Sequence, residues 1–139
     1  MSQVSKSLHL AVPADKVWEL IGSFNALPDW HPAVQSSSLE DGGKHRRLAL
    51  VGGGEIVERL EQLDDDGRLY RYSIVESPLP VSNYSSELRV VPDPDGSGCT
   101  VEWTGDFEAF NASASDAEKA IHGVYKLGLE NLQKMFGMK

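Results

Sequence analysis

The sequence has few of the residues that crosslink small proteins or bind metal ions. It contains one cysteine, Cys99, in 139 residues, which excludes an internal disulfide and a cysteine-rich zinc site. The four histidines are scattered, and no pair has metal-ligand spacing, so no metal site is predicted. No apolar run is long enough to cross a bilayer, and no signal peptide is recognisable. We therefore expect a cytoplasmic protein that inserts into no membrane.

The common catalytic signatures are also missing. The chain has no nucleophile elbow, phosphate-binding loop or dinucleotide fingerprint. Gly52-Gly53-Gly54 lacks the Lys-Ser/Thr that completes a phosphate site, and Asp64-Asp65-Asp66-Gly67 lacks the further ligands of a calcium loop. Both are interpreted as turns between strands. The sequence therefore predicts no cofactor.

Positive charge is scarce. Thirteen Lys and Arg oppose 21 Asp and Glu, so the net charge is -8. Such a surface repels nucleic acid and anionic membrane at long range, and neither is expected as a partner. Lys44-His45-Arg46-Arg47 is the only basic cluster, and it is interpreted as a solvated strand start. The pattern makes no prediction of oligomeric state.

What remains is the pattern of an α+β domain spanning residues 1–139. Apolar residues alternate in Ser5–Val12, as in a half-buried strand. Pro13 then ends the strand and begins a short amphipathic helix. Alternation returns in six further segments: 34–40, 46–51, 55–63, 69–76, 84–91 and about 100–108.

The last segment has helical periodicity. Ser113 or Ser115 can cap a helix of about six turns, here expected to begin near Ser115. Its predicted apolar stripe is Ala117, Ile121, Val124, Leu127, Leu132 and Met135. A curved antiparallel sheet of seven strands needs an apolar cover on its concave face, and this helix is the only predicted element long enough to supply it.

The order of elements, with VPADKVW (residues 12–18) near its start, resembles the START-like (SRPBCC) superfamily. The chain is identified as a polyketide cyclase/dehydrase-like member related to the abscisic acid receptor branch. This resemblance implies the helix-grip fold of Bet v 1 and START proteins, a seven-stranded curved sheet around a long C-terminal helix. It also implies a cavity between the two, without naming what fills it.

Glu58 is the most informative candidate. It alternates in phase with Ile56 and Leu60, so it should point inward, where desolvation would raise its pKa. A bend near the glycine run could instead return it to solvent. The receptor resemblance implies a pocket-facing carboxylate at this position. Arg59 should not offset the desolvation, because adjacent strand residues point to opposite faces. If Glu58 is buried as a carboxylate in the empty protein, Glu58→Gln should stabilise the fold modestly.

The same resemblance implies that Tyr72, Ile74 and Tyr84 line the pocket, although core packing explains the tyrosines equally well. Receptors also carry a lysine for the hormone carboxylate, a longer gate loop and a His-Arg-Leu latch. Here Pro32–Gln35 contains no lysine, and Pro78-Leu79-Pro80 replaces the latch. An abscisic acid receptor is therefore not expected.

Three further residues have two interpretations each. His31, in the corner Asp29–Pro32, either contacts a ligand as an acid or base or only hydrogen-bonds the backbone. Gly123 and Gly128 each cost helix stability. They allow either close approach of the helix to the sheet or space for a ligand, and Gly128→Leu tests the second by filling that space.

Strand parity and the resemblance together predict a cavity wall of ten residues. They are Leu48, Leu50, Ile56, Glu58, Tyr72, Ile74, Tyr84, Leu88, Val124 and Gly128. The first hypothesis is a binding or carrier protein for a small apolar or aromatic, lipid- or polyketide-like molecule. The second is a cofactor-independent cyclase or dehydratase using Glu58 with Tyr84 or His31 as acid and base. The third is a protein-partner module with an exposed apolar patch.

Overall fold

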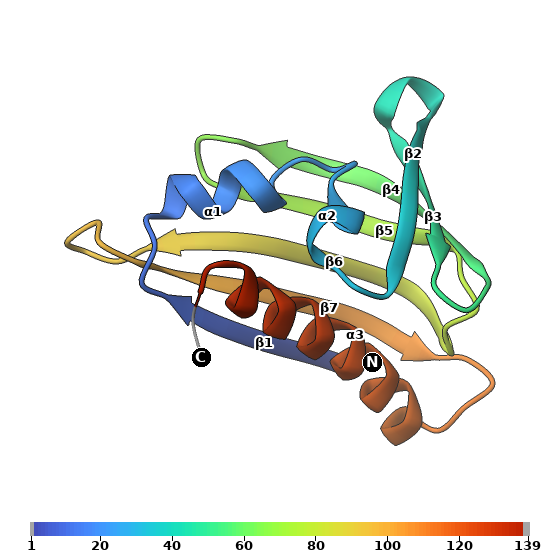
Figure 1. The fold of residues 1–139 in the computed structure, drawn as a ribbon. Helices are drawn as coiled ribbons and strands as arrows, with labels where there is room; N and C mark the ends of the chain where they lie inside the picture. Colours follow the sequence, from blue (N-terminus) through green and yellow to red (C-terminus); the bar gives the residue numbers. More distant parts are fainter. Residues whose placement is uncertain (1, 138–139) are drawn as a thin grey trace.

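The computed structural model describes residues 2–137. Within them the chain forms seven strands, three α-helices and one 3-10 turn (Figure 1). The elements, in order, are β1 (Ser2–Leu10), α1 (Ala14–Ile21), α2 (Leu27–Trp30), β2 (Val34–Glu40), η1 (Asp41–Gly43), β3 (His45–Leu50), β4 (Glu55–Asp64), β5 (Leu69–Glu76), β6 (Val81–Pro92), β7 (Cys99–Ala109) and α3 (Ala114–Met135).

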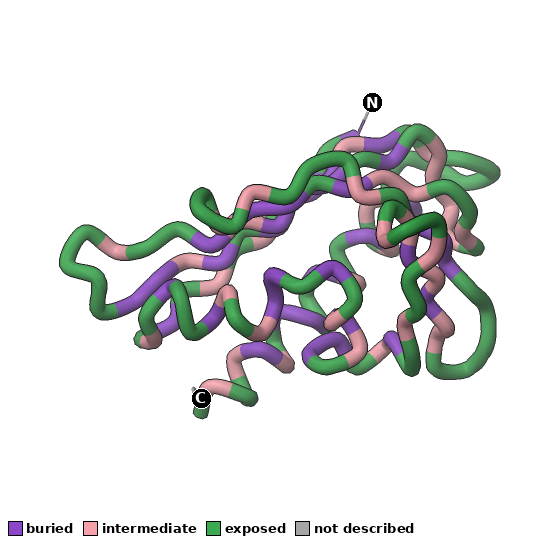
Figure 2. Tube along the Cα trace, turned by 90° about the horizontal axis from the view of Figure 1, so that it is seen from above, coloured by how far each residue is buried: buried purple, intermediate pink, exposed green. Residues whose placement is uncertain are grey.

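The strands form one antiparallel sheet in the order β1-β7-β6-β5-β4-β3-β2. Consecutive strands from β2 to β7 are neighbours, while α1 and α2 carry the chain from β1 at one edge to β2 at the other. The sheet arches over the helices, and buried residues gather on the side facing them (Figure 2). The predicted architecture is therefore confirmed.

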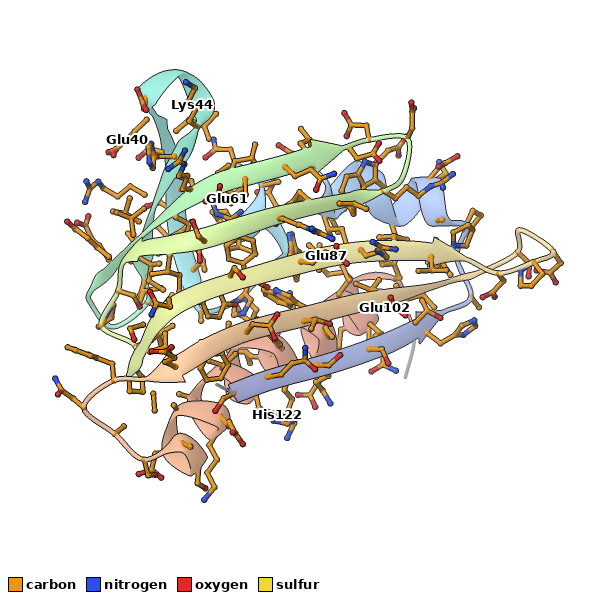
Figure 3. The ribbon with its side chains drawn as sticks, turned by 180° about the vertical axis from the view of Figure 1, so that it is seen from behind. Glu40, Lys44, Glu61, Glu87, Glu102 and His122 are labelled. Carbon is orange, nitrogen blue, oxygen red and sulfur yellow. The ribbon has the colours of Figure 1, made fainter. Side chains whose placement is uncertain are left out.

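The outer face of the sheet is polar. Glu61, Glu87 and Glu102 project from β4, β6 and β7 on the side away from α3 (Figure 3). Successive residues of a strand face opposite sides of the sheet, so the residues next to each of these glutamates in the sequence can pack inward. Strand alternation thus separates a solvated face from an apolar face, as the sequence predicted.

The long helix begins where its cap permits. The Ser113 side chain accepts a hydrogen bond from the Asp116 backbone N–H at 3.0 Å. This satisfies one of the free donors at the helix start and identifies Ser113, rather than Ser115, as the cap. Helix α3 has 22 residues, about six turns.

Two residues of the predicted apolar stripe of α3 are exposed, and Val124 is only half-buried. Leu127 and Met135 are 44% and 46% exposed, so their assignment to the stripe was wrong. The helix buries Tyr125 and Leu129 in their place. A helical period of 3.6 residues leaves the stripe uncertain by one position when apolar residues occur on both sides, as they do here.

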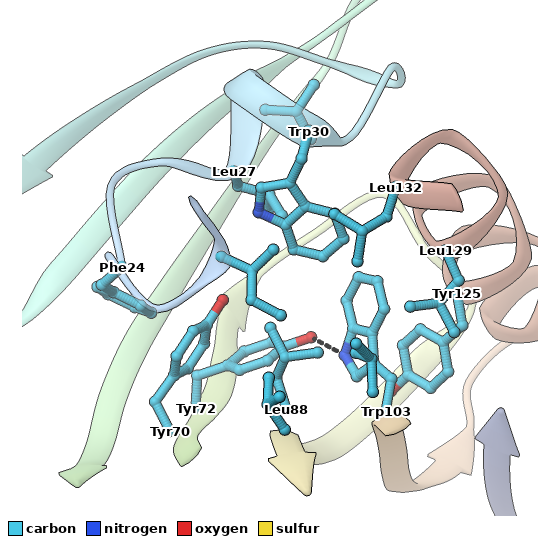
Figure 4. Packing of buried hydrophobic residues seen from close by; sticks show 14 of the residues in the cluster. Phe24, Leu27, Trp30, Tyr70, Tyr72, Leu88, Trp103, Tyr125, Leu129 and Leu132 are labelled. Carbon is cyan, nitrogen blue, oxygen red and sulfur yellow. Dashed lines mark hydrogen bonds between the residues drawn. The ribbon is translucent and has the colours of Figure 1, made fainter. Parts of the chain in front are cut away.

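Aromatic side chains fill the space between α3 and the sheet (Figure 4). The Trp103 ring on β7 stacks on Tyr125 of α3, with ring centroids 4.4 Å apart. The ring centroids of Trp30 on α2 and Trp103 lie 5.4 Å apart. These contacts join the three elements that enclose the site described next, and offset or tilted ring pairs of this kind stabilise beyond their area burial.

Candidate ligand-binding site

A cavity of about 250 Å³ lies among the sheet, the α2 corner and α3. Eight of the ten predicted wall residues line it: Leu48, Leu50, Ile56, Glu58, Tyr72, Ile74, Tyr84 and Val124. They come from β3, β4, β5, β6 and α3. That these eight contact a ligand stays a prediction.

Leu88 and Gly128 were also predicted to line the cavity, but neither does. Leu88 is fully buried in the core. A Cβ at Gly128 would lie 2.6 Å from His31 Cδ2 and 3.1 Å from ring atoms of Trp30 and Trp103. Gly128 therefore allows close packing and leaves no room for a ligand, so Gly128→Leu would disrupt packing instead of filling the cavity.

Several wall residues were not among the ten predicted. Trp103 lines the cavity from β7, a strand that supplied none of the ten. Ile121 belonged to the predicted helix stripe. Apart from His31, the remaining members lie in α2, at or just before the start of β2, after β3 and before β6, and all but Val34 lie outside the strands, where no strand parity applies: Leu27, Ala33, Val34, Val51, Gly53 and Leu79.

Arg46 corrects the interpretation of the basic cluster. Its side chain is fully buried, whereas Lys44 is exposed and Arg47 is half-buried. A solvated strand start was therefore the wrong interpretation for Arg46. A usable signal existed, because Arg46 shares its parity with Leu48 and Leu50, which had been placed on the inner face.

Arg46 and Glu58 form a buried ion pair. They lie directly opposite each other on β3 and β4. Arg46 Nε donates to Glu58 Oε1 at 2.7 Å, and Nη2 lies 2.6 Å from the same oxygen. The strand register shifts between Val57 and Glu58, yet Glu58 is only 5% exposed. The irregularity therefore does not return Glu58 to solvent.

Aromatic rings and a carbonyl hold the rest of the Arg46 guanidinium. Nη1 donates to the Phe24 carbonyl oxygen at 2.6 Å. The guanidinium carbon lies 4.1 Å from the Phe24 ring centre and 5.1 Å from that of Tyr72. A cation over ring faces is stabilised by their negative potential. Arg46 does not itself line the cavity, so Glu58 separates its charge from the cavity space.

Burial and pairing act in opposite directions on this pair. Burial raises the pKa of Glu58 above its ordinary value, although Arg46 opposes the shift. Burial lowers the pKa of Arg46, but Glu58 and the neighbouring tyrosines raise it by more. The direction predicted for Glu58 agrees with the structure. The partner was missed, because only Arg59, which points outward, had been considered.

Hydroxyl groups form a connected chain beside the ion pair. The Tyr72 and Tyr84 oxygens lie 3.2 Å apart, and the Tyr84 hydroxyl is hydrogen-bonded to that of Tyr125. Tyr125 lies 3.1 Å from Ser86 Oγ. Burial raises the pKa values of all three tyrosines, so the hydroxyls are protonated.

The chain ends on backbone and on an indole. Ser86 Oγ donates to the Thr104 carbonyl oxygen at 2.8 Å. Trp103 Nε1 lies 3.1 Å from both the Tyr72 and Ser86 oxygens; the bond to Tyr72 is drawn in Figure 4. Tyr72, Tyr84 and Trp103 face the cavity, so part of its wall is a closed hydroxyl network.

His31 lines the cavity and hydrogen-bonds backbone on both sides. Nε2 lies 2.8 Å from the Val124 carbonyl oxygen of α3, and Nδ1 accepts from the Ala33 N–H at 3.2 Å. A carbonyl only accepts, so Nε2 carries the proton and the ring is neutral. Burial lowers the pKa of His31, and the charge of Arg46 adds to this, against the raising effect of the Val124 bond.

Within residues 2–137, no group of three or more His, Cys, Asp or Glu side chains could hold a metal ion. Among the described helices, none is both long and apolar enough to cross a membrane.

A model of the family described as "Polyketide cyclase / dehydrase and lipid transport" matches residues 1–137. The chain belongs to this family. The structure of the protein XoxI from Bacillus cereus is similar to that of this chain. It is 41% identical, with a TM-score of 0.95, over 98% of this chain and 96% of that one.

More distant structures share the fold of the family. A START superfamily protein from Mycobacterium smegmatis is 14% identical with a TM-score of 0.79, over 97% of each chain. The Zhui aromatase/cyclase from Streptomyces sp. R1128 is 21% identical with a TM-score of 0.77, over 98% of this chain and 93% of that one. The expected START-like helix-grip fold is thus confirmed.

Proposed function

We propose that the protein binds a small apolar or aromatic molecule in the cavity between the sheet and α3. The observation that carries this proposal is a largely apolar cavity with one buried carboxylate, that of Glu58, on its wall. Apolar walls supply affinity, and a few placed polar groups orient the ligand, as in small-molecule sites generally. The family description, which includes lipid transport, supports the same reading.

The volume limits the size of the ligand. Cavities for drug-sized molecules span about 300–1,000 Å³. This cavity, at about 250 Å³, lies just below that range. A one- or two-ring aromatic molecule or a short acyl chain fits without rearrangement, whereas a full-length polyketide would need the walls to move apart.

The cyclase or dehydratase alternative needs a group that can give or take a proton within the cavity. Most polar atoms of its candidates are already engaged, and Oε2 of Glu58 is the exception among the described contacts. Both nitrogens of His31 are bonded to backbone, and Glu58 Oε1 is held by Arg46. The Tyr84 hydroxyl belongs to the hydrogen-bonded chain. These contacts favour binding over catalysis.

The protein-partner alternative requires an exposed apolar patch in place of an enclosed cavity. Cavity volume and the direction of Glu58 are the features that separate the hypotheses. A cavity is present, and Glu58 faces it. Both favour a small ligand.

Native mass spectrometry of the purified protein tests the proposal directly, by the mass of any molecule that copurifies. Titration calorimetry with 1-naphthol tests it with a defined compound. Val124→Trp should fill the cavity from α3 and abolish binding, because Val124 is on the wall. Val91→Trp, on a half-exposed residue of β6 away from the cavity, is the matched control and should bind normally. Equal binding by both variants would contradict the proposal.

A further inference from the structure

The polar side chains on the cavity wall share one property: none has a proton to offer a ligand, because Glu58 is an ionised carboxylate paired with Arg46 and the others donate their protons to protein atoms. Resting on the proposed function, we infer that the cavity selects uncharged molecules that donate a hydrogen bond, such as phenols, alcohols or indoles. Molecules whose polar groups only accept, and carboxylates, are discriminated against. The donors and acceptors of the described wall residues account for this selectivity.

The direction of the hydroxyl chain is fixed at its end. The Thr104 carbonyl can only accept, so the single proton of Ser86 points to it. Tyr125 must then be the donor in its bond to Ser86. Because Tyr125 has spent its proton there, Tyr84 is the donor in the bond to Tyr125.

The donor direction continues from Tyr84 to Tyr72, toward the cavity. Tyr84 has donated to Tyr125, so Tyr72 donates to Tyr84. The Trp103 N–H is shared between the Tyr72 and Ser86 oxygens. Tyr72, Tyr84 and Trp103 all lie on the wall, yet none has a proton left for a ligand. The hydroxyls of Tyr72 and Tyr84 offer the cavity only lone pairs.

The other two polar wall residues, His31 and Glu58, also offer no proton to a ligand. His31 donates from Nε2 to Val124 and accepts at Nδ1 from Ala33, so it offers the ligand no proton. Glu58 uses Oε1 for Arg46, and no described residue donates to its Oε2. An ionised carboxylate only accepts, and bonds to a charged acceptor are stronger than neutral ones. Oε2 of Glu58 is therefore the strongest acceptor on the wall.

The charge balance favours an uncharged ligand. Glu58 is the only Asp, Glu, Lys or Arg on the described wall, and its charge is already compensated by Arg46. An anionic ligand would meet a carboxylate, with every Arg46 nitrogen directed elsewhere. A cationic ligand would be desolvated on entering the cavity. The carboxylate that it meets is already paired with Arg46, so their attraction would not offset the cost of desolvation. Two buried donors, Trp30 Nε1 and Arg46 Nη2, have no hydrogen-bond partner among the described residues, although Nη2 lies in ion-pair contact with Glu58 Oε1 at 2.6 Å. Neither Trp30 nor Arg46 is on the wall.

Three compounds of similar shape separate the possibilities in the unmodified protein. 1-Naphthol donates, 1-methoxynaphthalene only accepts, and 1-naphthoate is an anion. Calorimetry should give an affinity for 1-naphthol at least about tenfold above that for 1-methoxynaphthalene, which is the effect of one hydrogen bond to a charged group. 1-Naphthoate should bind more weakly than both.

The outcomes are distinguishable. Equal or tighter binding of 1-methoxynaphthalene or 1-naphthoate would overturn this inference and leave the proposed function standing. Failure of all three to bind would overturn the proposed function and the inference with it.

Tyr84→Phe tests the direction of the chain. The substitution keeps the ring but removes the acceptor of the Tyr72 proton, which can then turn to the cavity. The preference for 1-naphthol over 1-methoxynaphthalene should fall several-fold. Tyr70→Phe is the control, since Tyr70 is a buried tyrosine off the wall whose hydroxyl meets only Arg46, at 3.4 Å. Unchanged preference in a folded Tyr84→Phe protein, judged by far-UV circular dichroism, would contradict the assigned direction.

Discussion

Arg46 and Glu58 face each other across β3 and β4 and bury an ion pair beneath the cavity. A buried pair of this kind contributes little net stability, because desolvating two charges offsets their attraction. Removing one partner is different, since it leaves the other charge buried alone. The pair therefore makes each residue dependent on the other.

Glu58→Gln should destabilise the protein by about 3–5 kcal/mol, since the Arg46 guanidinium would lose its counter-charge. This reverses the modest stabilisation expected from the sequence, which assumed a buried carboxylate without a partner. Urea denaturation measures the change. The double variant Arg46→Met with Glu58→Leu should recover most of the loss. A single variant as stable as the wild type would show that the pair is not buried.

The two glycines of α3 should respond oppositely to alanine. Nothing lies within 4 Å of a Cβ at Gly123, so Gly123→Ala should stabilise by about 0.5–1 kcal/mol through helix propensity. Gly128→Ala should destabilise, because its Cβ would lie 2.6 Å from His31. Thermal unfolding of the two variants provides a matched pair. Stabilisation by both would contradict the close approach at Gly128.

His31 should make stability depend on pH. Its pKa is lowered in the fold from the ordinary value of 6.5, mainly by burial. Below that value the unfolded chain binds a proton that the folded protein resists, so stability is present above about pH 6.5 and is lost as pH falls toward the folded pKa. The free energy of unfolding, followed by urea denaturation between pH 7 and pH 5, should fall less steeply in His31→Gln. The same substitution at exposed His122 controls for general effects, and identical slopes in His31→Gln and wild type would refute the assignment.

The tyrosine chain should show a graded response to phenylalanine. Tyr125→Phe leaves the Tyr84 proton without its acceptor, which costs about 1–3 kcal/mol for a buried donor. Tyr72→Phe removes only a proton that Tyr84 accepts, and Trp103 keeps its bond to Ser86. Tyr72→Phe should therefore be the milder change in urea denaturation. The opposite order would mean that the chain runs the other way.

Local patterns predicted most of the fold and part of the site. Alternation placed Glu58 on the inner face because strand parity is a local property. The same parity applied to Arg46, but the charge of its neighbours favoured a solvated interpretation. Packing across elements was not readable in this way. The difference between Gly123 and Gly128 depends on Trp30, His31 and Trp103, which lie far away in the sequence.

The pairing of β1 with β7 also has a consequence for the order of folding. Ser2 lies opposite Phe107, and Leu10 opposite Cys99, so β1 pairs with the strand of this sheet that lies furthest from it in the sequence. Such long-range pairing requires closure of a large loop, which slows folding. Helix α3 follows β7, so the element that covers the cavity is synthesised after all seven strands of the sheet. During translation the inner face of the sheet therefore lacks its cover until α3 has been made.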